Sequence, residues 1–348
     1  MVKKIIILIF VLTLIVALSG FTSVKNTEKV VANPYTSAQA AVLLEKNSHR
    51  ILFQKNMDLK LPMASCTKIL TALTVVENCN VEETVTVPQQ AVGIEGSSIY
   101  LRAGEKLTVK ELLYGLLLRS GNDSAVALAL HVSGSLEDFR TLMNATAKKY
   151  GANDSNFVTP HGLDAKDHYT TAYDLAKISC FALKNPTIAE IVSSKSAKIG
   201  NEEEGNFRLL YNKNKLLNNY SFADGVKTGY TKKAGRCFVG SATKDGMQLV
   251  CVVLNCGPMF EETQSLLQYG FCNYRLKTVV PKNKVFKLNC PDGNEYYRCE
   301  EQIAFPLKSD GTEDKLIALK LSTDEGNLPV LEINFKNKLL FCRKLSII

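Results

Sequence analysis

The sequence predicts an α/β fold in which helices pack on an antiparallel sheet, followed by a small all-β domain. Three observations support this prediction. Strand-like segments begin near residue 40, a block of helical segments follows, and strands return after residue 195. Beyond about residue 277 there are only short strands separated by turn residues. Strands on both sides of a helical block favour one sheet covered by helices.

The N-terminus has the pattern of an export signal. Lys3 and Lys4 precede an apolar run from Ile5 to Leu18, and small residues follow. A basic start, a short apolar run and small residues are typical of a secretory signal, and the run is shorter than the about 20 residues of a membrane-spanning helix. Residues 1–22 are therefore predicted to be a signal peptide or an uncleaved anchor, and the rest of the chain is predicted to be exported.

Length and composition limit the class of protein. The remainder of a 348-residue chain is too long for one small core, so residues 33–276 and 277–348 are predicted to form two domains. The net charge of +8 fits association with anionic polymers or a membrane surface, but a solvated basic surface is the favoured explanation. No nucleic-acid-binding motif is present. The ten cysteines include no Cys-x-x-Cys pair, so we expect buried thiols, although an exported protein also permits disulfides.

The first strands and the first helix follow from periodicity. Ala40–Glu45 and Ile51–Gln54 are predicted to form a hairpin, which ends before Pro62. A helix is predicted from Ser65 to Val76, because apolar residues recur in it at helical spacing. The next helix begins at the capping-box pair Thr108 and Glu111. That helix contains the apolar segment Leu112–Leu118, and the other helices of the block are predicted at Ala125–Val132, Leu136–Tyr150 and Thr171–Leu183.

Alternating apolar and polar residues mark the later strands. Lys244-Asp245-Gly246 provides a tight turn between the last two of them. A closing helix, Glu261–Tyr269, is predicted to end at Gly270, and the C-terminus is predicted to end in a strand. The predicted strands of this part are Phe207–Leu210, Gly225–Gly229, Cys237–Ala242 and Gln248–Asn255.

Three short motifs carry the chemistry, and they occur in a fixed order. They are Ser65-Cys66-Thr67-Lys68, Ser120-Gly121-Asn122 and Lys227-Thr228-Gly229. Residues three apart on a helix share a face, with Cβ atoms about 5–6 Å apart, so Lys68 is predicted to reach the Ser65 hydroxyl. A second Ser-x-x-Lys at Ser241 runs from a strand into a turn, where nothing holds the amine over the hydroxyl. Ser65 is therefore the predicted nucleophile.

The motifs complement one another chemically. A serine hydroxyl needs a base to take its proton, and a lysine acts as a base only if burial or a nearby cation keeps part of it neutral. Lys68 is the predicted base and Lys227 the nearby cation. Ser120 is predicted to relay a proton to the departing amine, and Asn122 to orient Lys68 and the substrate amide.

The third motif is predicted to bind substrate. Lys227 and Thr228 are expected to meet a terminal carboxylate, and Gly229 lets a peptide lie along the strand edge as an added strand. The backbone N–H groups of Ser65 and Tyr230 are the predicted oxyanion site.

The chain resembles the D-alanyl-D-alanine carboxypeptidases, which are low-molecular-mass penicillin-binding proteins, over residues 33–275. The resemblance implies a β-lactamase/penicillin-binding-like transpeptidase fold and removal of the terminal D-alanine from peptidoglycan stem peptides through an acyl-enzyme on Ser65. It also implies covalent inhibition by β-lactam antibiotics, no metal or cofactor, a role in cell-wall biogenesis, and a C-terminal β module. Besides the motifs, the similar segments are Pro160-His161-Gly162-Leu163, His168-Tyr169-Thr170-Thr171-Ala172, Asn212–Leu217 and Asp224-Gly225-Val226.

Some residues depart from the family pattern. Cys66 and Arg119 are unusual neighbours of the first two motifs. No basic residue lies between Pro258 and Glu262, where one is expected to bind the substrate carboxylate, so Lys227 and Thr228 are expected to make that contact alone. His161 and His168 are expected to shape the helical region without a catalytic role.

Other functions remain as alternatives. A D,D-endopeptidase cutting crosslinks would use the same chemistry, and a weakly catalytic penicillin-binding sensor would keep the same motifs. A β-lactamase is disfavoured, because Glu202–Asn206 is predicted to be a solvated hairpin tip and no other Glu is well placed to activate a deacylating water. Zinc-protease and α/β-hydrolase motifs are absent from the sequence.

Overall fold

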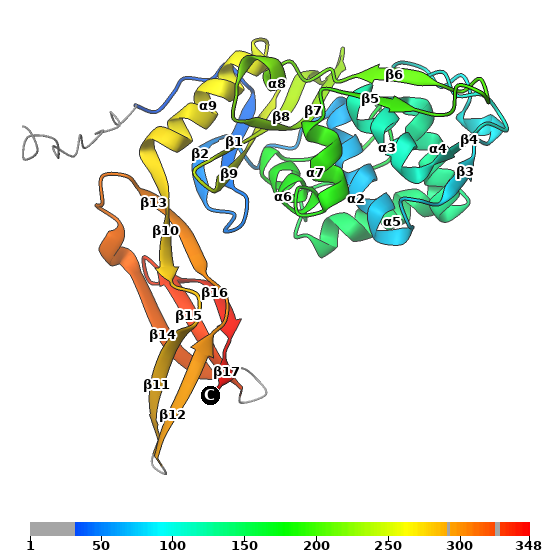
Figure 1. Cartoon of the computed structure of the whole chain (residues 1–348). Helices are drawn as coiled ribbons and strands as arrows, with labels where there is room; N and C mark the ends of the chain where they lie inside the picture. The colour runs from blue at the N-terminus through cyan, green and yellow to red at the C-terminus, as the bar shows by residue number, and fades with distance from the viewer. Residues whose placement is uncertain (1–31, 291–292, 324–327) are drawn as a thin grey trace, which may run out of the picture. The chain divides into compact units, whose positions relative to one another are not determined.

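The computed structural model describes residues 32–290, 293–323 and 328–348 (Figure 1). The predicted export segment, residues 1–22, lies outside the described residues. In the described part of the chain, no helix combines the length and the apolar character that crossing a membrane requires.

A five-stranded antiparallel sheet organises the first and larger part of the described chain. Its strand order is β2-β1-β9-β8-β7, so the first hairpin pairs with a strand far along the sequence, with Val42 opposite Val252. The strands are β1 (Ala40–Glu45), β2 (Ile51–Lys55), β7 (Ala223–Thr231), β8 (Gly235–Lys244) and β9 (Met247–Leu254). This sheet confirms the predicted hairpin and the three predicted strands after residue 220. It leaves β7, with the Lys-Thr-Gly motif, at one edge.

Helices cover both faces of the sheet, because alternate residues of the buried strands point to opposite sides. In β1, Val42 packs with the large helical block, whereas Leu43 packs against the closing helix. The block consists of α2 (Lys68–Asn78), α3 (Val109–Leu118), α4 (Asn122–Ser133), α5 (Leu136–Lys149), α6 (Ala172–Ala182) and α7 (Pro186–Ser193), and the other face carries α8 (Leu216–Asn219) and α9 (Met259–Asn273). The predicted capping box of Thr108 and Glu111 is present at the start of α3.

The end of α9 and the start of α7 differ from the prediction. Gly270 was expected to end the closing helix, but α9 continues to Asn273. A Cβ at Gly270 would lie 2.5 Å from Leu249 and 2.9 Å from Leu43, so this glycine lets α9 approach the sheet. Pro186 was expected only to follow a helix, but it is the first residue of α7, where its missing N–H costs no hydrogen bond.

Short strand pairs and a C-terminal all-β region complete the described chain. β3 (Thr84–Thr86) pairs with β4 (Lys106–Thr108), and β5 (Ser196–Ile199) with β6 (Arg208–Tyr211). The C-terminal strands are β10 (Tyr274–Val280), β11 (Lys284–Cys290), β12 (Gly293–Cys299), β13 (Ile303–Lys308), β14 (Ile317–Thr323), β15 (Pro329–Phe335), β16 (Lys338–Lys344) and β17 (Ser346–Ile347). The chain thus ends in strands, as predicted. The proposed boundary between residues 276 and 277 falls inside β10 and stays a prediction.

The structure describes the pairing state of nine of the ten cysteines, and all nine are free thiols.

Arg50, in the turn between β1 and β2, is held by groups from the C-terminal strands. Its guanidinium donates to both carboxylate oxygens of Glu313, at 2.7 and 2.9 Å, and to the Pro306 carbonyl. The cation also lies over the Phe335 and Tyr274 rings, 4.7 and 5.1 Å from their centroids. Both charged side chains are nearly buried, with 12% and 5% of their surfaces exposed. Removing Glu313 would leave the Arg50 charge without its counter-ion, whereas removing Arg50 would leave Glu313 with only Lys336, at 3.3 Å, as a cationic partner.

We expect Arg50→Ala to lower the free energy of unfolding by about 3 kcal/mol, the lower end of the usual cost of breaking a buried ion pair, because Lys336 still lies beside Glu313. The matched control is Lys60→Ala, which removes a lysine from an exposed pair with Asp154 and should change stability by less than about 1 kcal/mol. Urea denaturation of both variants measures the difference, and equal effects would show that Arg50 is no more important than a surface charge.

Candidate active site

Ser65 lies on a 3₁₀ turn, Ala64–Thr67, that leads directly into α2. The prediction that the α-helix itself begins at Ser65 was therefore wrong by one turn. Ala64, at the start of this turn, has a positive φ of 50°, which residues other than glycine rarely adopt. The hydroxyl of Thr67 donates to the Ala64 carbonyl at 2.8 Å, and a Cβ at Gly162 would collide with that same carbonyl. The hydrogen bond from Thr67 and the close approach of Gly162 thus both restrain the turn that carries Ser65.

His168 braces this turn in its neutral form. Its Nδ1 accepts a hydrogen bond from the Val158 N–H at 2.9 Å. The proton of the neutral ring is therefore on Nε2, which donates to the Thr67 hydroxyl at 2.9 Å. Burial lowers the pKa of His168 to about 4. This environment agrees with the expectation that His168 shapes the helical region.

Lys68 is completely buried at the first residue of α2, and its amine has three neighbours. Nζ lies 3.0 Å from the Ser65 hydroxyl, 2.7 Å from Asn122 Oδ1 and 2.6 Å from the His161 carbonyl oxygen. Two of these atoms only accept hydrogen bonds, whereas the serine hydroxyl also donates. A neutral amine satisfies this set by donating twice and accepting the Ser65 proton.

The charge state of Lys68 favours that arrangement. Burial, followed by the positive charges of Lys227 and Lys213, lowers the pKa of Lys68 well below its ordinary value. The predicted causes, burial and the cation of the third motif, are both present.

The junction of α3 and α4 carries the second motif. Ser120 has a φ of 65°, and α4 begins immediately afterwards at Asn122. The Asn122 N–H donates to the Ser97 carbonyl at 2.6 Å, and its side-chain amide donates to the Glu95 carbonyl. Because the side-chain nitrogen of Asn122 donates to Glu95, the side-chain oxygen is the atom that faces Lys68.

The third motif lies on edge strand β7, against the turn that carries Ser65. A Cβ at Gly229 would be 2.9 Å from the Met63 carbonyl and 3.0 Å from the Ser65 nitrogen, so only glycine permits this approach. Lys227 is buried, its Nζ donates to the Thr228 carbonyl at 2.9 Å, and burial lowers its pKa to about 7.

Cys66 points away from the nucleophile. Its thiol is fully buried against the Lys227 carbonyl, with Sγ at 3.6 Å. The unusual neighbour of the first motif is therefore a core residue, and its burial raises the pKa of the thiol.

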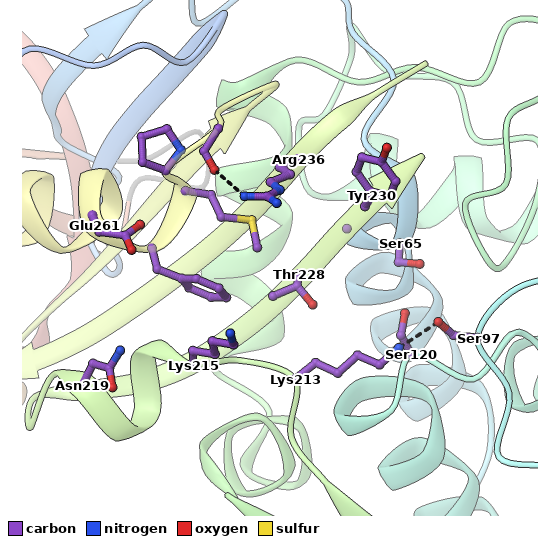
Figure 2. Close-up of a pocket in the computed structure, with 15 residues that line it drawn as sticks. Ser65, Ser97, Ser120, Lys213, Lys215, Asn219, Thr228, Tyr230, Arg236 and Glu261 are labelled. Carbon is purple, nitrogen blue, oxygen red and sulfur yellow. Dashed lines mark hydrogen bonds between the residues drawn. The ribbon is translucent and has the colours of Figure 1, made fainter. Parts of the chain in front are cut away.

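A pocket of about 990 Å³ opens over these motifs (Figure 2). It brings together Ser65, Ser120, Thr228, Gly229 and Tyr230 of the predicted site. Lys68, Asn122 and Lys227 lie behind this surface, where they are buried. The competing Ser241 is instead fully buried and donates to Asp224 at 2.5 Å.

The pocket also contains cations that the motifs did not identify. Lys213 belongs to a segment marked by the family resemblance, and its Nζ donates to Ser97 Oγ at 2.8 Å. Lys215 lies farther along the wall. Arg236, on β8, had no signal in the sequence. Ser97 was also missed, because a lone serine in a loop has no distinctive pattern.

The fold, together with Ser65 at the pocket surface and the buried Lys68 beside it, defines a class of protein, the serine hydrolases of the β-lactamase and penicillin-binding type.

Comparison with known proteins narrows this class. Residues 27–257 match the family described as D-alanyl-D-alanine carboxypeptidase, peptidase family S11. The chain is 33% identical over 299 residues to D-alanyl-D-alanine carboxypeptidase DacF of Bacillus subtilis, covering 83% of this chain and 76% of that protein. The chain therefore belongs to the D-alanyl-D-alanine carboxypeptidase family.

Solved structures agree with this assignment. Penicillin-binding protein 5 of Haemophilus influenzae is similar over 91% of this chain and 98% of its own, with 26% identity and a TM-score of 0.76. A mutant of the Streptomyces K15 DD-transpeptidase is similar over 69% of this chain and 99% of its own, with 32% identity and a TM-score of 0.64. The predicted family, fold class and enzyme class are confirmed: the chain is a serine-type carboxypeptidase of the penicillin-binding type, and a hydrolase.

We expect the neutral state of His168 to make the protein less stable in acid. The unfolded chain takes up this proton near the ordinary pKa of about 6.5, whereas the folded chain does so only near pH 4. The free energy of unfolding should therefore fall as pH decreases from about 6.5 to 4, by up to about 1.4 kcal/mol per pH unit for this histidine.

His168→Ala should reduce that slope and also slow acylation of Ser65, because a displacement of about 1 Å can cost about 100-fold in rate. The matched control is His49→Ala, since burial also lowers the pKa of His49 to about 4 but its ring packs edge-to-face with Phe181. This control should reduce the slope alone. Urea denaturation against pH and the rate of acylation by a chromogenic β-lactam give the two readouts. An unchanged acylation rate in His168→Ala would refute the bracing role.

Proposed function

We propose that this chain removes the terminal D-alanine from peptidoglycan stem peptides, with Ser65 as the acylated nucleophile and Lys68 as its base. The observation that supports this assignment most strongly is the set of neighbours around the Lys68 amine. Two carbonyl-type oxygens accept its hydrogens, and its remaining position faces the Ser65 hydroxyl at 3.0 Å.

Acylation proceeds by direct proton transfer. Ser65 Oγ attacks the carbonyl carbon of the scissile peptide bond while its proton moves to Lys68 Nζ. The developing oxyanion accepts hydrogen bonds from the backbone N–H groups of Ser65 and Tyr230. The closeness of Gly229 to the Ser65 nitrogen supports this pair of donors, because it brings β7 and the nucleophile turn together.

The leaving group then takes its proton from the same base. The C–N bond breaks as Ser120 passes the proton from Lys68 to the departing amine, and free D-alanine leaves an ester on Ser65. Water attacks this ester while Lys68 accepts its proton. The bond between the acyl carbon and Ser65 Oγ then breaks, Lys68 returns the proton to Oγ, and the shortened peptide is released. Thr228, at the pocket surface, contacts the substrate carboxylate, and the buried Lys227 attracts it through its charge from behind the strand. Asn122 orients Lys68 and the substrate amide.

The cellular setting follows from the substrate. Peptidoglycan lies outside the cytoplasmic membrane, so we infer that residues 1–22 export the chain and that it works at the cell wall or at the outer face of the cytoplasmic membrane. The basic net charge of +8 is compatible with contact with anionic polymers or headgroups there.

Product analysis tests the proposal. The purified chain should convert a stem pentapeptide to the tetrapeptide plus D-alanine, and a penicillin adduct should be found on Ser65 by mass after digestion. Cleavage of crosslinked muropeptides instead would favour the endopeptidase alternative, and acylation without turnover of any peptide would favour the sensor. Labelling that persists in Ser65→Ala would overturn the nucleophile assignment.

The roles of the two buried lysines should separate with pH. The rate of acylation by a chromogenic β-lactam, plotted against pH, should have a rising limb where Lys68 loses its proton. This limb should lie well below the ordinary lysine pKa, because burial and the charge of Lys227 lower the pKa of Lys68. Lys68→Ala should lose about 100- to 10,000-fold in rate, the range of general-base catalysis. Lys227→Ala should move the limb to higher pH, because a repelling cation has been removed.

The control for Lys227→Ala is Lys233→Ala, which removes an exposed lysine from the β7–β8 turn and should leave the limb in place. A limb that moves to lower pH in Lys227→Ala, or a Lys68→Ala variant that keeps most of its rate, would contradict these roles.

A further inference from the structure

We propose that Arg236 binds the C-terminal carboxylate of the substrate together with Thr228, and so makes this chain selective for peptides with a free carboxyl end. This inference rests on the proposed function. Lys227 and Thr228 alone were expected to make that contact, because the segment after β9 has no basic residue. Arg236, on β8, would take the role of that basic residue.

The strand register brings Arg236 to the substrate face of the sheet. Arg236 on β8 is paired with Tyr230 on β7, and Phe238 is paired with Thr228. Side chains of paired residues project to the same face, and so do those of residues two apart. Arg236 and Thr228 are therefore diagonal neighbours on one face, and both line the pocket with Ser65 (Figure 2).

The Arg236 guanidinium has hydrogen-bonding capacity to spare. Its Nη1 donates to the Gly257 carbonyl at 3.2 Å. Within the described residues this is its one protein partner, and no carboxylate forms an ion pair with it. A guanidinium carries five N–H donors in a planar fork that matches a carboxylate. The bond to Gly257 holds the fork at the pocket wall, and most of its donors remain for a ligand.

The segment after β9 ends in two acidic residues, of which Glu261 lines the pocket and Glu262 contacts another part of the chain. Glu262 accepts hydrogen bonds from the Thr36 hydroxyl at 2.6 Å and the Ser37 hydroxyl at 2.7 Å. Although burial acts in the opposite direction, these hydrogen bonds lower the pKa of Glu262 to about 2. Its charge is thus engaged with the chain preceding β1, and Glu262 is not among the residues that line the pocket.

The two lysines of the pocket are less suitable for this contact. Lys213 already donates to Ser97, and burial lowers its pKa. Lys215 lies beside α8 rather than on the sheet face that carries Thr228. An ammonium group is also a point charge, whereas the arginine fork binds both carboxylate oxygens at once.

The test compares two substrates that differ only at the carboxyl end. For the wild type and for Arg236→Gln, kcat/KM is measured on a stem pentapeptide ending in D-alanine and on the same peptide with a C-terminal amide, by mass detection of the products. A charge-assisted bidentate contact is worth about 10- to 100-fold. Arg236→Gln should therefore lose that factor on the acid and less than about 3-fold on the amide. Arg236→Lys, which keeps the charge without the fork, should fall between.

Two control variants make the outcome specific. Lys233→Gln removes the same charge from an exposed turn and should keep the wild-type preference for the acid, as should Lys215→Gln. Equal losses on the acid and the amide in Arg236→Gln would show that this residue only supports the Gly257 backbone, and would overturn the proposal. Loss of the preference in Lys215→Gln instead would reassign the contact. A wild type that cleaves neither peptide would refute the proposed function itself, which is a different result from an active enzyme whose preference does not depend on Arg236.

Discussion

The burial of the Lys68 amine is the constraint on which the rest of the site depends. An ammonium ion inside a protein is costly unless an anion pairs with it, and the three hydrogen-bond neighbours of Nζ are neutral groups. The fold thus stabilises the amine in its uncharged form. That form is the one that accepts a proton from a hydroxyl, so the same burial that would penalise an ordinary lysine produces a base.

Each neighbouring element contributes to keeping this amine buried and oriented. Asn122 reaches it from the start of α4, and the His161 carbonyl reaches it from the segment before α6. Gly162 and Gly229 leave no Cβ where the nucleophile turn meets its neighbours. His168 holds Thr67 and thereby the turn itself. These contacts come from parts of the chain about 50 to 160 residues apart in sequence, and the five-stranded sheet with its helical block is what brings them together.

The pocket divides into a buried part that handles protons and an exposed part that recognises the substrate. Lys68 and Lys227 are buried and repel each other, which lowers the pKa of Lys68. Arg236 and Tyr230 lie at the surface, on adjacent strands. In this division the inner charges determine the reactivity of Ser65. The outer cation, by our proposal, determines which peptide ends are accepted. A change at the outer surface alters selectivity without disturbing the base.

The sequence alone was sufficient for the features that depend on near neighbours along the chain. The Ser-x-x-Lys spacing placed Lys68 beside Ser65, the Thr108 and Glu111 pair predicted the start of α3, and alternation predicted β8 and β9. These features are encoded within three or four residues or by a regular period, so they can be read locally. The order of the three motifs and the similar segments also predicted the family.

Only the tertiary structure decided the features that depend on register and close packing. Gly270 was predicted to stop a helix, but its contact with Leu43, more than 200 residues away, lets α9 continue. The brace of His168 on Thr67 and the position of Arg236 opposite Tyr230 had no local pattern either. Whether a strand residue faces a pocket is set by its partner across the sheet, and a shift of one residue would turn it to the other face. Strand pairing is a property of the folded chain. Arg236 could therefore be recognised as the cation that the segment from Pro258 to Glu262 lacks only from the tertiary structure.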